Sequence, residues 1–447
     1  MRIMNSLPPA HGRPPWEVLM KYRLMLPLWG LIIANHTTLA AAAPGEPVIP
    51  EHTVSIMSFD ARADGATDNA GAVQKAIDTV AKTGGRVVVP KGVFLCGPIR
   101  LASHVELRLE KGATLRMLPL DANFPSENGR CLSFISAKNC TDIKISGAGF
   151  IDGQGAAWWP LARAKKLALR RPQLVTFERC ERVLLENITT IDPPNTHYAL
   201  RLCKDVTMRG LTLRAPGNST NTDGINISGK NYLITNCDIS TGDDNIVILT
   251  HSAKDWAKPM CENFEIRDCK FGEGHGVSIG SHTSGGIRNV LVENCSFERT
   301  TAAIRMKAHR DKGGLVEDLT YRNLTVTGAR YPLFISSYYP KEPKDPSLDP
   351  GTGAPAEIKP RWRNILIENL TVSDSQNSII IWGLPELPIT GVTIRKAGFV
   401  AQKGALVFNA EKIVFDDVKI LCEKPPSLRT HKAGVEVITN CMEMLKL

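Results

Sequence analysis

One four-residue pattern recurs along the chain and decides the fold: Asn187-Ile188-Thr189-Thr190, Asn236-Cys237-Asp238-Ile239, Asn294-Cys295-Ser296-Phe297, Asn323-Leu324-Thr325-Val326 and Asn369-Leu370-Thr371-Val372. The third and fourth copies start 29 residues apart, the earlier ones at about twice that interval, 49 and 58 residues, and the last interval of 46 residues contains one long insertion. A period of roughly 25–30 residues is typical of solenoids. Short strands rich in Val, Ile and Thr, with no amphipathic helix between them, cannot form βαβ units. Because each segment buries one face only by stacking on its neighbours, the pattern predicts an all-β protein, a right-handed parallel β-helix.

The flanks of the repeat refine this prediction. Asn at the same point of successive coils fits a ladder of side-chain amides, although the Asn-x-Thr/Ser triplets also match glycosylation sites. Residues 68–82 combine an Asp/Asn cap with apolar residues at helical spacing and stop at Gly84-Gly85. We expect this short N-terminal helix to cap the open end of the stack, and residues 44–447 to form a single β-helix domain.

Residues 1–43 are typical of a secretory signal peptide. Lys21-Tyr22-Arg23 precedes an apolar run over residues 24–34, which is too short to span a bilayer, and an Ala-rich stretch ends at Ala43. We predict cleavage near Ala42 or Ala43 and a secreted or periplasmic location, with a retained membrane anchor as the alternative. Met20 is the more ordinary start, because the residues before it are Pro-rich.

Composition narrows the class of protein. The 447 residues are 43% hydrophobic and 22% charged, which excludes collagen-like and disordered chains. The formal net charge is +9, and the residues after 43 retain +6 because four positive charges and one negative charge precede them. An excess of positive charge suits a polyanion such as an acidic polysaccharide, a membrane surface or a nucleic acid. The sequence contains no basic run with interleaved aromatic residues, which is the feature that would favour nucleic acid as the partner.

The chain contains 11 cysteines. Cys140, Cys237, Cys269 and Cys295 each follow Asn or Asp. This repetition indicates one structural position revisited, where Cys serves as a small buried apolar residue. No pair has the close spacing of a zinc site. We expect most cysteines in the core, with room for one or two disulfides.

Four short segments carry chemistry: Asn221-Thr222-Asp223-Gly224, Thr241-Gly242-Asp243-Asp244, Gly274-His275-Gly276 and Arg305-Met306-Lys307. Each is an ordinary turn or strand segment alone, but they recur at intervals of about one coil, and neighbouring strands lie about 4.8 Å apart. We therefore expect them at the corresponding place in successive coils, forming one patch on one face.

The patch would join carboxylates to cations. Asp243 and Asp244 can both reach one groove only where the strand is irregular, and Gly242 supplies local freedom. Clustered carboxylates repel one another, so one of them should hold a proton well above its normal pKa, as a general acid requires. The basic side chains would limit this repulsion and attract an anionic substrate.

In this order and spacing, Asn-Thr-Asp, Gly-Asp-Asp, Gly-His-Gly and Arg-x-Lys resemble the signature of polygalacturonases, the pectin-degrading enzymes of glycoside hydrolase family 28. The similarity covers most of the mature chain, including residues 60–69 near its start. It implies a right-handed β-helix that cleaves α-1,4-galacturonosyl linkages with inversion and needs no metal or other cofactor. We expect a monomer that acts on pectin or polygalacturonate, with neither a nucleic acid nor, once the signal is cleaved, a membrane as partner.

The resemblance also implies roles for the catalytic residues by position. Asp243 resembles the general acid that protonates the leaving oxygen. Asp223 and Asp244 resemble the pair that holds and activates the attacking water. His275 resembles the histidine that supports the protonation of the acid.

The same resemblance assigns substrate contacts. Arg305 and Lys307 resemble the cations that grip substrate carboxylates, and Asn221 is a further candidate for binding substrate. Tyr339 resembles the substrate-binding tyrosine of the family, with Tyr338 as an adjacent competitor.

Two other functions remain open. The acidic pairs could hold calcium in a pectate lyase-like enzyme, or the protein could be a non-catalytic β-helix that binds an acidic glycan. Cleavage at the chain end or within the chain is also undecided. The insertion at residues 339–360 is expected to border the groove.

Overall fold

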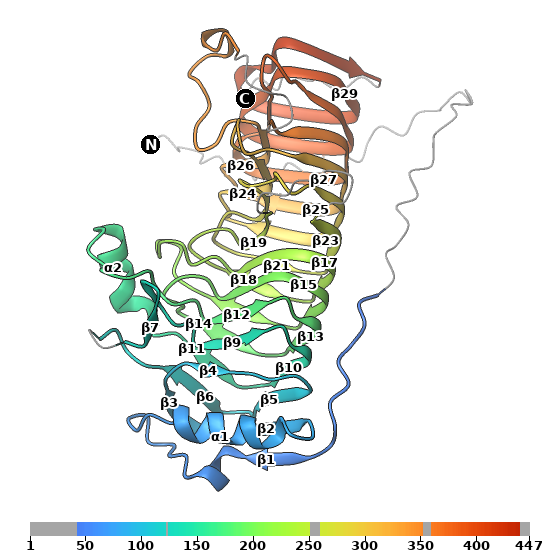
Figure 1. The fold of residues 1–447 in the computed structure, drawn as a ribbon. Coiled ribbons are helices and arrows are strands. Elements are labelled where there is room, and N and C mark those ends of the chain that lie inside the picture. The colour runs from blue at the N-terminus through green and yellow to red at the C-terminus, as the bar shows by residue number, and fades with distance from the viewer. Residues whose placement is uncertain (1–42, 122–123, 251–259, 352–358, 439–447) are drawn as a thin grey trace, which may run out of the picture. The chain divides into compact units, whose positions relative to one another are not determined.

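The computed structural model describes residues 43–121, 124–250, 260–351 and 359–438, and within these ranges 27 strands form one sheet (Figure 1). Each strand pairs in parallel with the corresponding strand of the next coil; Ile225, for example, pairs with Ile246, and Ile246 pairs with Val277. A parallel sheet that returns to itself once per turn, with crossovers of the usual hand, is a right-handed parallel β-helix, so the predicted fold is confirmed.

The first coils and their cap precede the segments singled out above. They contain β1 Thr53–Ser55, the 3₁₀ helix η2 Ile56–Phe59, α1 Ala70–Val80, β2 Gly85–Val89, β3 Gly92–Cys96, β4 Ile99–Arg100, β5 Val105–Leu109, β6 Ala113–Met117, β9 Ile135–Lys138, β10 Thr141–Gly147 and β11 Phe150–Asp152. Two excursions leave the coils here. They are the antiparallel hairpin of β7 Ser126–Glu127 with β8 Arg130–Cys131, and the 3₁₀ helix η3 Gly155–Ala157 followed by α2 Trp158–Arg163.

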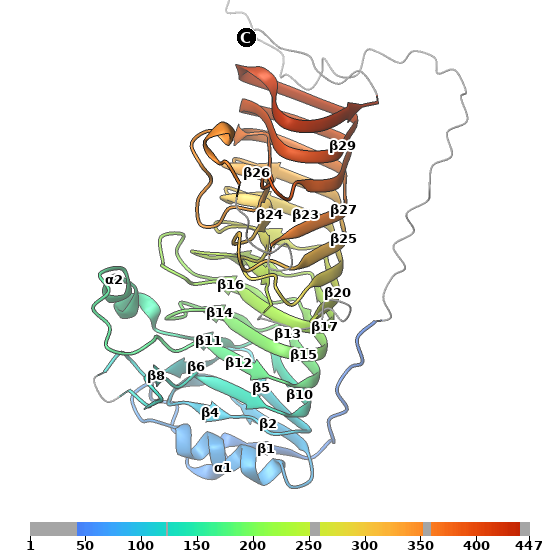
Figure 2. The same ribbon diagram turned by 45° about the horizontal axis from the view of Figure 1, so that its top comes forward.

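The remaining coils follow without a further α-helix among the described residues. The middle coils are β12 Val175–Glu178, β13 Glu181–Glu186, β14 Thr189–Ile191, β15 Tyr198–Arg209, β16 Thr212–Arg214, β17 Ile225–Thr235, β18 Asp238–Ser240, β19 Ile246–Ile248, β20 Cys261–Arg267, β21 Lys270–Phe271, β22 Val277–Ile279, β23 Ile287–Glu298 and β24 Ala302–Lys307. The last coils are β25 Leu315–Thr327, β26 Tyr331–Ser336, η4 Pro346–Leu348, β27 Arg361–Asn377, β28 Ile379–Trp382 and β29 Ile389–Val437. Figure 2 shows how these strands stack.

Alternation along each strand fills the interior of the coils. Ile225, Ile246, Val277 and Ile304 point inward at equivalent positions and are fully buried. Aromatic rings stack in the same way, with ring centroids 4.7 Å apart for Phe271 and Phe297. Residues between the inward positions face outward, so the same register that builds the core also lines up outward side chains from one coil to the next.

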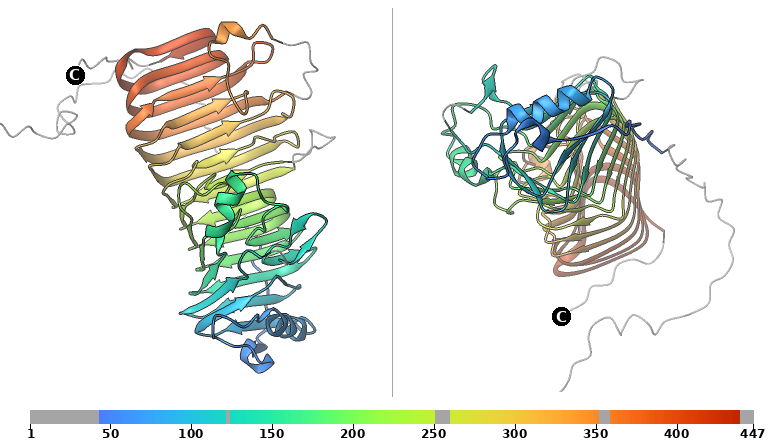
Figure 3. Two further views of the ribbon diagram at one scale, coloured as in Figure 1. Left: turned by 90° about the vertical axis from the view of Figure 1, so that its left-hand side faces the viewer. Right: turned by 90° about the horizontal axis from the view of Figure 1, so that it is seen from below.

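The predicted capping helix is present as α1, which lies across the first coils (Figure 3). Its buried face consists of Val73, Ala76, Ile77 and Val80. The Asp68 carboxylate accepts hydrogen bonds from the backbone N–H groups of Ala70, at 2.9 Å, and Gly97, at 2.8 Å, which ties the start of the helix to the first coil. The apolar face of α1 therefore covers a sheet end that would otherwise be open.

The predicted asparagine ladder is present in the C-terminal coils. The Asn294 amide donates to Asp268 Oδ1 at 3.2 Å, Asn323 donates to Asn294 at 3.0 Å, and Asn369 donates to Asn323 at 2.8 Å. Each of these residues has a positive φ near 55°, a conformation that Asn tolerates better than other non-glycine residues. In the earlier coils the ladder is interrupted, because the Asn236 amide donates instead to Thr235.

Replacing Asn323 by Ala should lower the free energy of unfolding by about 2 kcal/mol, because Ala loses two ladder hydrogen bonds and is strained at a φ of 56°. Asn323→Gly is the matched control, since Gly accepts this φ and loses only the hydrogen bonds. The midpoint of chemical denaturation should fall further for Ala than for Gly. Equal midpoints would show that the backbone conformation does not select Asn here.

All ten described cysteines are free, and all but Cys140 are buried. The interpretation of cysteine as a core residue is thus correct, and among the described residues the disulfides that the sequence left room for do not form. Cys237, Cys269 and Cys295 each follow a residue with φ between 54° and 56°, which turns the thiol inward.

The signal-peptide prediction falls on residues 1–43, nearly all of which lie outside the described residues. Within the described part of the chain, no helix combines the length and apolar character needed to span a membrane.

Candidate active site

The predicted site lies on the outer face of the sheet strip formed by β17, β19, β22 and β24. Ile225, Ile246 and Val277 pair side by side on successive strands. Two residues before them stand Asp223, Asp244 and His275, respectively. The three side chains therefore start from equivalent points of three successive coils.

Arg305 and Lys307 do not share that position, contrary to the expectation of one equivalent place for all four segments. Arg305 pairs with Ser278, and Ser278 pairs with Val247, so the two cations stand further along the strand direction than His275. Their long side chains reach back to the carboxylates, so the structure still brings the predicted groups together.

Asp243 and Asp244 belong to the turn between β18 and β19 rather than to a strand, as the irregularity argument required. The reason for Gly242 differs from the prediction. Its φ is not positive, but a Cβ there would lie 2.0 Å from the carbonyl oxygen of Ser219. Close approach of the preceding coil, rather than conformational freedom, requires glycine at this position.

Asp244 is the most firmly held carboxylate of the cluster. Its Oδ1 accepts hydrogen bonds from Arg305 Nη1 at 2.8 Å and Ser278 Oγ at 2.7 Å, and its Oδ2 accepts one from Lys307 Nζ at 2.8 Å. Burial alone would raise the pKa of Asp244, but Lys307, His275 and Arg305 outweigh it and hold the pKa well below its ordinary value. Asp244 is therefore ionised throughout the physiological range.

His275 is presented by a turn that only glycines permit. A Cβ on Gly274, at a φ of 133°, would lie 2.5 Å from the Asn245 amide, and one on Gly276, at a φ of 69°, would lie 2.1 Å from the Ala302 carbonyl oxygen. His275 Nδ1 lies 3.1 Å from Asp243 Oδ1.

The carboxylates decide the charge of this imidazole. Burial would lower the pKa of His275, but hydrogen bonds to Asp243 and Asp244 raise it to about 9. The imidazolium then donates to Asp243. Arg305 Nη1 lies 2.9 Å from the same nitrogen, so two positively charged donors are in contact. Asp244 Oδ1 lies close to both, and its negative charge compensates their repulsion.

Asp223 is the carboxyl whose proton is held most strongly. Burial, followed by the charges of Asp243 and Asp244, raises its pKa to about 7. Asn226 donates to Asp223 Oδ2 at 3.0 Å. The cluster thus places one carboxyl that retains a proton to near neutrality beside one that is ionised.

Asp243 is more accessible than Asp244, with a quarter of its side chain exposed against 6%. The amide of Asn221 donates to Asp243 Oδ2 at 3.3 Å, and Arg171 donates to the carbonyl oxygen of that amide at 2.8 Å. Asn221 is therefore oriented from behind by an arginine.

Of the two tyrosines, Tyr339 is the one beside the site. Lys307 Nζ lies 5.5 Å from the centre of its ring. The hydroxyl of Tyr338 instead donates to Asp349 at 2.5 Å, and its ring packs against Trp382. Asp349 follows η4 in the insertion at residues 339–360, and it is also bound by Arg310 at 2.8 Å. The described part of the insertion is thus tied down next to the site.

Three residues with direct roles in this geometry were missed from the sequence. Ser278 and Asn226 are polar residues between two apolar ones on a strand, and their alignment with Arg305 across coils was a usable signal. Arg171 gave no signal, because it lies in the long excursion before β12, which does not follow the repeat.

Asp243, Asp244 and His275 offer ligand atoms within 4.8 Å of one another and so form a candidate metal group. Both oxygens of Asp244 already accept hydrogen bonds from cationic side chains. A divalent cation would have to displace two positive charges, so the group is poorly suited to a metal.

In glycoside hydrolases one carboxyl group retains a proton and acts as the general acid, while an ionised carboxylate beside it acts as the base or nucleophile. The cluster described here has this arrangement. Residues 80–405 match the family model of glycosyl hydrolases family 28. The chain is a member of glycoside hydrolase family 28, and therefore an enzyme that hydrolyses glycosidic bonds.

Individual relatives agree with this assignment. The chain is 32% identical over 344 residues to an endo-polygalacturonase of Pectobacterium carotovorum subsp. carotovorum, an alignment that covers 71% of this chain and 83% of the relative. The solved polygalacturonase of Erwinia carotovora ssp. carotovora shares 28% identity with a TM-score of 0.69, over 84% of this chain and 99% of that one. An exopolygalacturonase from Thermotoga maritima, at 24% identity and a TM-score of 0.69, covers 90% of this chain and 94% of its own and supports the fold alone.

Proposed function

We propose that this enzyme hydrolyses the α-1,4-galacturonosyl linkages of polygalacturonate and pectin with inversion of configuration. The observation that carries the proposal is the pair Arg305 and Lys307 held beside a carboxyl cluster that retains a proton. Such a site provides acid catalysis and a positive surface for a substrate with one carboxylate per sugar. The names of the similar polygalacturonases support the same substrate.

In this proposal Asp243 donates the proton. More accessible than Asp244, it protonates the glycosidic oxygen as the C–O bond breaks, and the leaving sugar departs with a new hydroxyl group. The cationic His275, whose Nδ1 lies 3.1 Å from Asp243 Oδ1, stabilises the charge that remains on Asp243 after transfer.

Asp223 and Asp244 are proposed to hold and activate the attacking water. The two stand one coil apart, and Asp244 is kept ionised by its three donors. As the oxygen of the water bonds to the anomeric carbon, its proton passes to the ionised form of Asp223. Inversion requires the acid and the base to be roughly 6.5–9.5 Å apart, with water between the base and the sugar. One coil plus the reach of the side chains between Asp243 and Asp223 suits this separation.

Arg305 and Lys307 are proposed to bind substrate carboxylates, with Asn221 and Tyr339 as further contacts. Tyr339 offers an aromatic face next to the Lys307 ammonium, so a sugar ring could pack on it while its carboxylate meets the cation.

A product analysis tests the proposal against a calcium-dependent lyase. Hydrolysis of polygalacturonate should release reducing ends without ultraviolet-absorbing unsaturated products, and excess EDTA should not reduce the rate. Proton NMR during the first turnovers should show the β-anomer at the new reducing end. Unsaturated products, or loss of activity in EDTA, would establish the lyase instead. The sizes of the early products separate cleavage within the chain from cleavage at its end.

We also propose that residues 1–43 direct export and are removed, and that residues 44–447 act as a monomeric catalytic domain. A polymeric substrate outside the cell gives a reason for export. Mass spectrometry of the protein recovered from the periplasm or medium should give a mature N-terminus near Pro44, and size exclusion should give one chain per particle.

The raised pKa of Asp223 sets the sign of a pH effect on stability. The folded protein binds this proton more tightly than the unfolded chain, so the stabilisation is complete below pH 3.8 and is lost as the pH rises through about 7. The Tm should therefore fall between pH 4 and pH 8.

Asp223→Asn should flatten that fall, because the variant has no proton to lose at this position. Thermal unfolding of both proteins over the same pH range provides the measurement. An equal pH dependence in variant and wild type would show that Asp223 is not the group that titrates. His275 contributes a loss of its own between about pH 6.5 and 9, because its pKa is raised from 6.5 to about 9, and this loss should remain in Asp223→Asn.

A further inference from the structure

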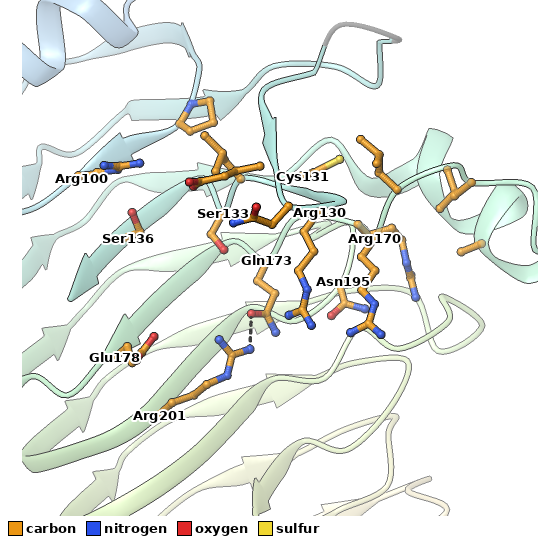
Figure 4. Close-up of a pocket in the computed structure, with 18 of the residues that line it drawn as sticks. Arg100, Arg130, Cys131, Ser133, Ser136, Arg170, Gln173, Glu178, Asn195 and Arg201 are labelled. Carbon is orange, nitrogen blue, oxygen red and sulfur yellow. Dashed lines mark hydrogen bonds between the residues drawn. The ribbon is translucent and has the colours of Figure 1, made fainter. Parts of the chain in front are cut away.

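A cavity of about 1210 Å³ lies next to the site on the side of the N-terminal coils (Figure 4). The hairpin β7–β8 and the excursion that contains α2 border it, above the strands β9, β12 and β15. Its volume exceeds the range usual for sites that hold one small ligand, so it is large enough for several sugar rings.

The cavity continues the surface that carries the catalytic cluster. One row of outward positions, paired coil by coil, runs from the cavity through the site: Arg100, Ser136, Thr176, Ala199, Asn226, Val247, Ser278 and Arg305. Arg171 joins the two regions physically, since it lines the cavity and donates to Asn221 beside Asp243. Along this row Ser136, which lines the cavity, stands three coils before Asn226, so a linear chain lying on the catalytic cluster continues into the cavity.

Basic side chains dominate the lining. It includes six cationic residues against two acidic ones, Glu127 and Glu178. The cations are Arg100, Arg130, Lys165, Arg170, Arg171 and Arg201. The Glu178 carboxylate is already shared by Lys138 and Arg179. The cavity thus has a marked excess of positive charge.

These arginines differ from those elsewhere on the coils. Arg86, Arg182, Arg209, Arg288 and Arg322 each form an ion pair with an acidic residue, for example Arg288 with Glu262. Among the residues that the structure describes, no carboxylate lies within ion-pair distance of Arg130, Arg170 or Arg201.

Arg130, Arg170 and Arg201 point into one part of the cavity, near Gln173 and Asn195 (Figure 4). Arg201 donates to the neutral Gln173 side chain at 2.8 Å. Burial and then the charge of nearby Arg130 lower the pKa of Arg201, and Glu178, beyond ion-pair distance, offsets part of this effect. Like charges that form no ion pair of their own favour an anion between them, and a guanidinium is well matched to a carboxylate.

We propose that this cavity binds the carboxylates of galacturonate units several sugars away from the cleaved linkage, with Arg130 and Arg201 as the principal contacts. The inference rests on the proposed function, since it names which part of the same polymer the remote surface takes. Arg130 belongs to β8, and a β-bridge places it next to Arg170. Arg201 belongs to β15. The two arginines therefore face the substrate from the excursion and from the coil.

The experiment compares a long and a short substrate. In the double variant Arg130→Gln/Arg201→Gln, kcat/KM on polygalacturonate should fall by about 10- to 100-fold, as expected for the loss of two charge-assisted hydrogen bonds. On trigalacturonate, which is too short to occupy both regions, kcat/KM should change by less than about twofold. Arg288→Gln/Arg322→Gln is the matched control, because it removes the same charge from paired arginines and should alter neither value.

An unchanged kcat/KM on polygalacturonate would overturn the inference. So would an equal fall on both substrates, because the arginines would then act at the site of cleavage. The proposed function is tested separately by the wild-type enzyme, which must cleave polygalacturonate. Calorimetry with hexagalacturonate probes the cavity without cleavage when both proteins also carry Asp243→Asn: adding Arg130→Gln/Arg201→Gln to that background should weaken binding about tenfold or more, and equal affinity would overturn the inference.

Discussion

Asp243→Asn is expected to lower kcat on polygalacturonate by about a thousandfold or more while the protein remains folded. An amide has almost the same shape as the carboxyl but cannot protonate the glycosidic oxygen. Asn at this position can still contact His275 and the amide of Asn221, so the surroundings should not collapse. Reducing-end assays under substrate excess provide the measurement, with thermal unfolding to verify the fold.

Asp238→Asn is the matched control for this variant. Asp238 lies on β18 close to the same turn, but its side chain is half exposed and pairs with Arg214. The same chemical change there should leave kcat within about twofold, since exposed ion pairs contribute little. Wild-type activity in Asp243→Asn would remove Asp243 from the role of acid.

The same variant separates an enzyme from a glycan-binding protein. If Asp243 supplies the proton, Asp243→Asn should still bind polygalacturonate with an affinity close to that of the wild type while failing to cleave it. A protein that only binds would show no catalytic difference between the two forms.

Lys307→Ala is expected to destabilise the protein by about 3 kcal/mol and to abolish activity. Lys307 and Asp244 form an ion pair at 2.8 Å, and only 7% and 6% of the two side chains are exposed. Removing the ammonium leaves a buried carboxylate with one cationic hydrogen-bond donor fewer, and an uncompensated buried charge is strongly unfavourable. Chemical denaturation and the polygalacturonate assay measure the two effects.

Two further variants isolate the cause. Lys307→Met combined with Asp244→Asn removes both charges, so it should regain much of the stability but none of the activity. Lys204→Ala removes an ammonium from an exposed pair with Glu181, and should change the free energy of unfolding by less than about 1 kcal/mol. If Lys307→Ala were as stable as Lys204→Ala, the buried ion pair between Lys307 and Asp244 would not contribute to stability as argued here.

The fold was predictable because the sequence repeats the same pattern, an Asn followed by a short apolar strand, in successive coils. Asn294, Asn323 and Asn369 mark positions with a positive φ, and the 29 residues from Asn294 to Asn323 give the length of a coil. Once the coil length is known, the intervals between Asp223, Asp244 and His275 place these residues in one column. The position of these three site residues could therefore be predicted from their separation along the sequence.

Other parts of the site lay beyond this reasoning. The offset of Arg305 and Lys307 along the strand depends on pairing register, which intervals of about one coil do not resolve. Arg171 and the walls of the cavity belong to the excursions around β7, β8 and α2, where the repeat stops. Which carboxyl retains the proton follows from burial and from the donors around Asp244, and these appear only when the coils are stacked.

The pairing of each strand with its equivalent in the next coil has a practical consequence for redesign. Register is carried by the strands, whereas the excursion before β12 and the insertion after β26 leave the stack and return to it. Provided that Arg171, which orients Asn221 beside Asp243, is kept, their length and composition can therefore be changed without altering the column of acidic groups. Transplanting such segments between related enzymes offers a route to new substrate preferences on an unaltered catalytic scaffold.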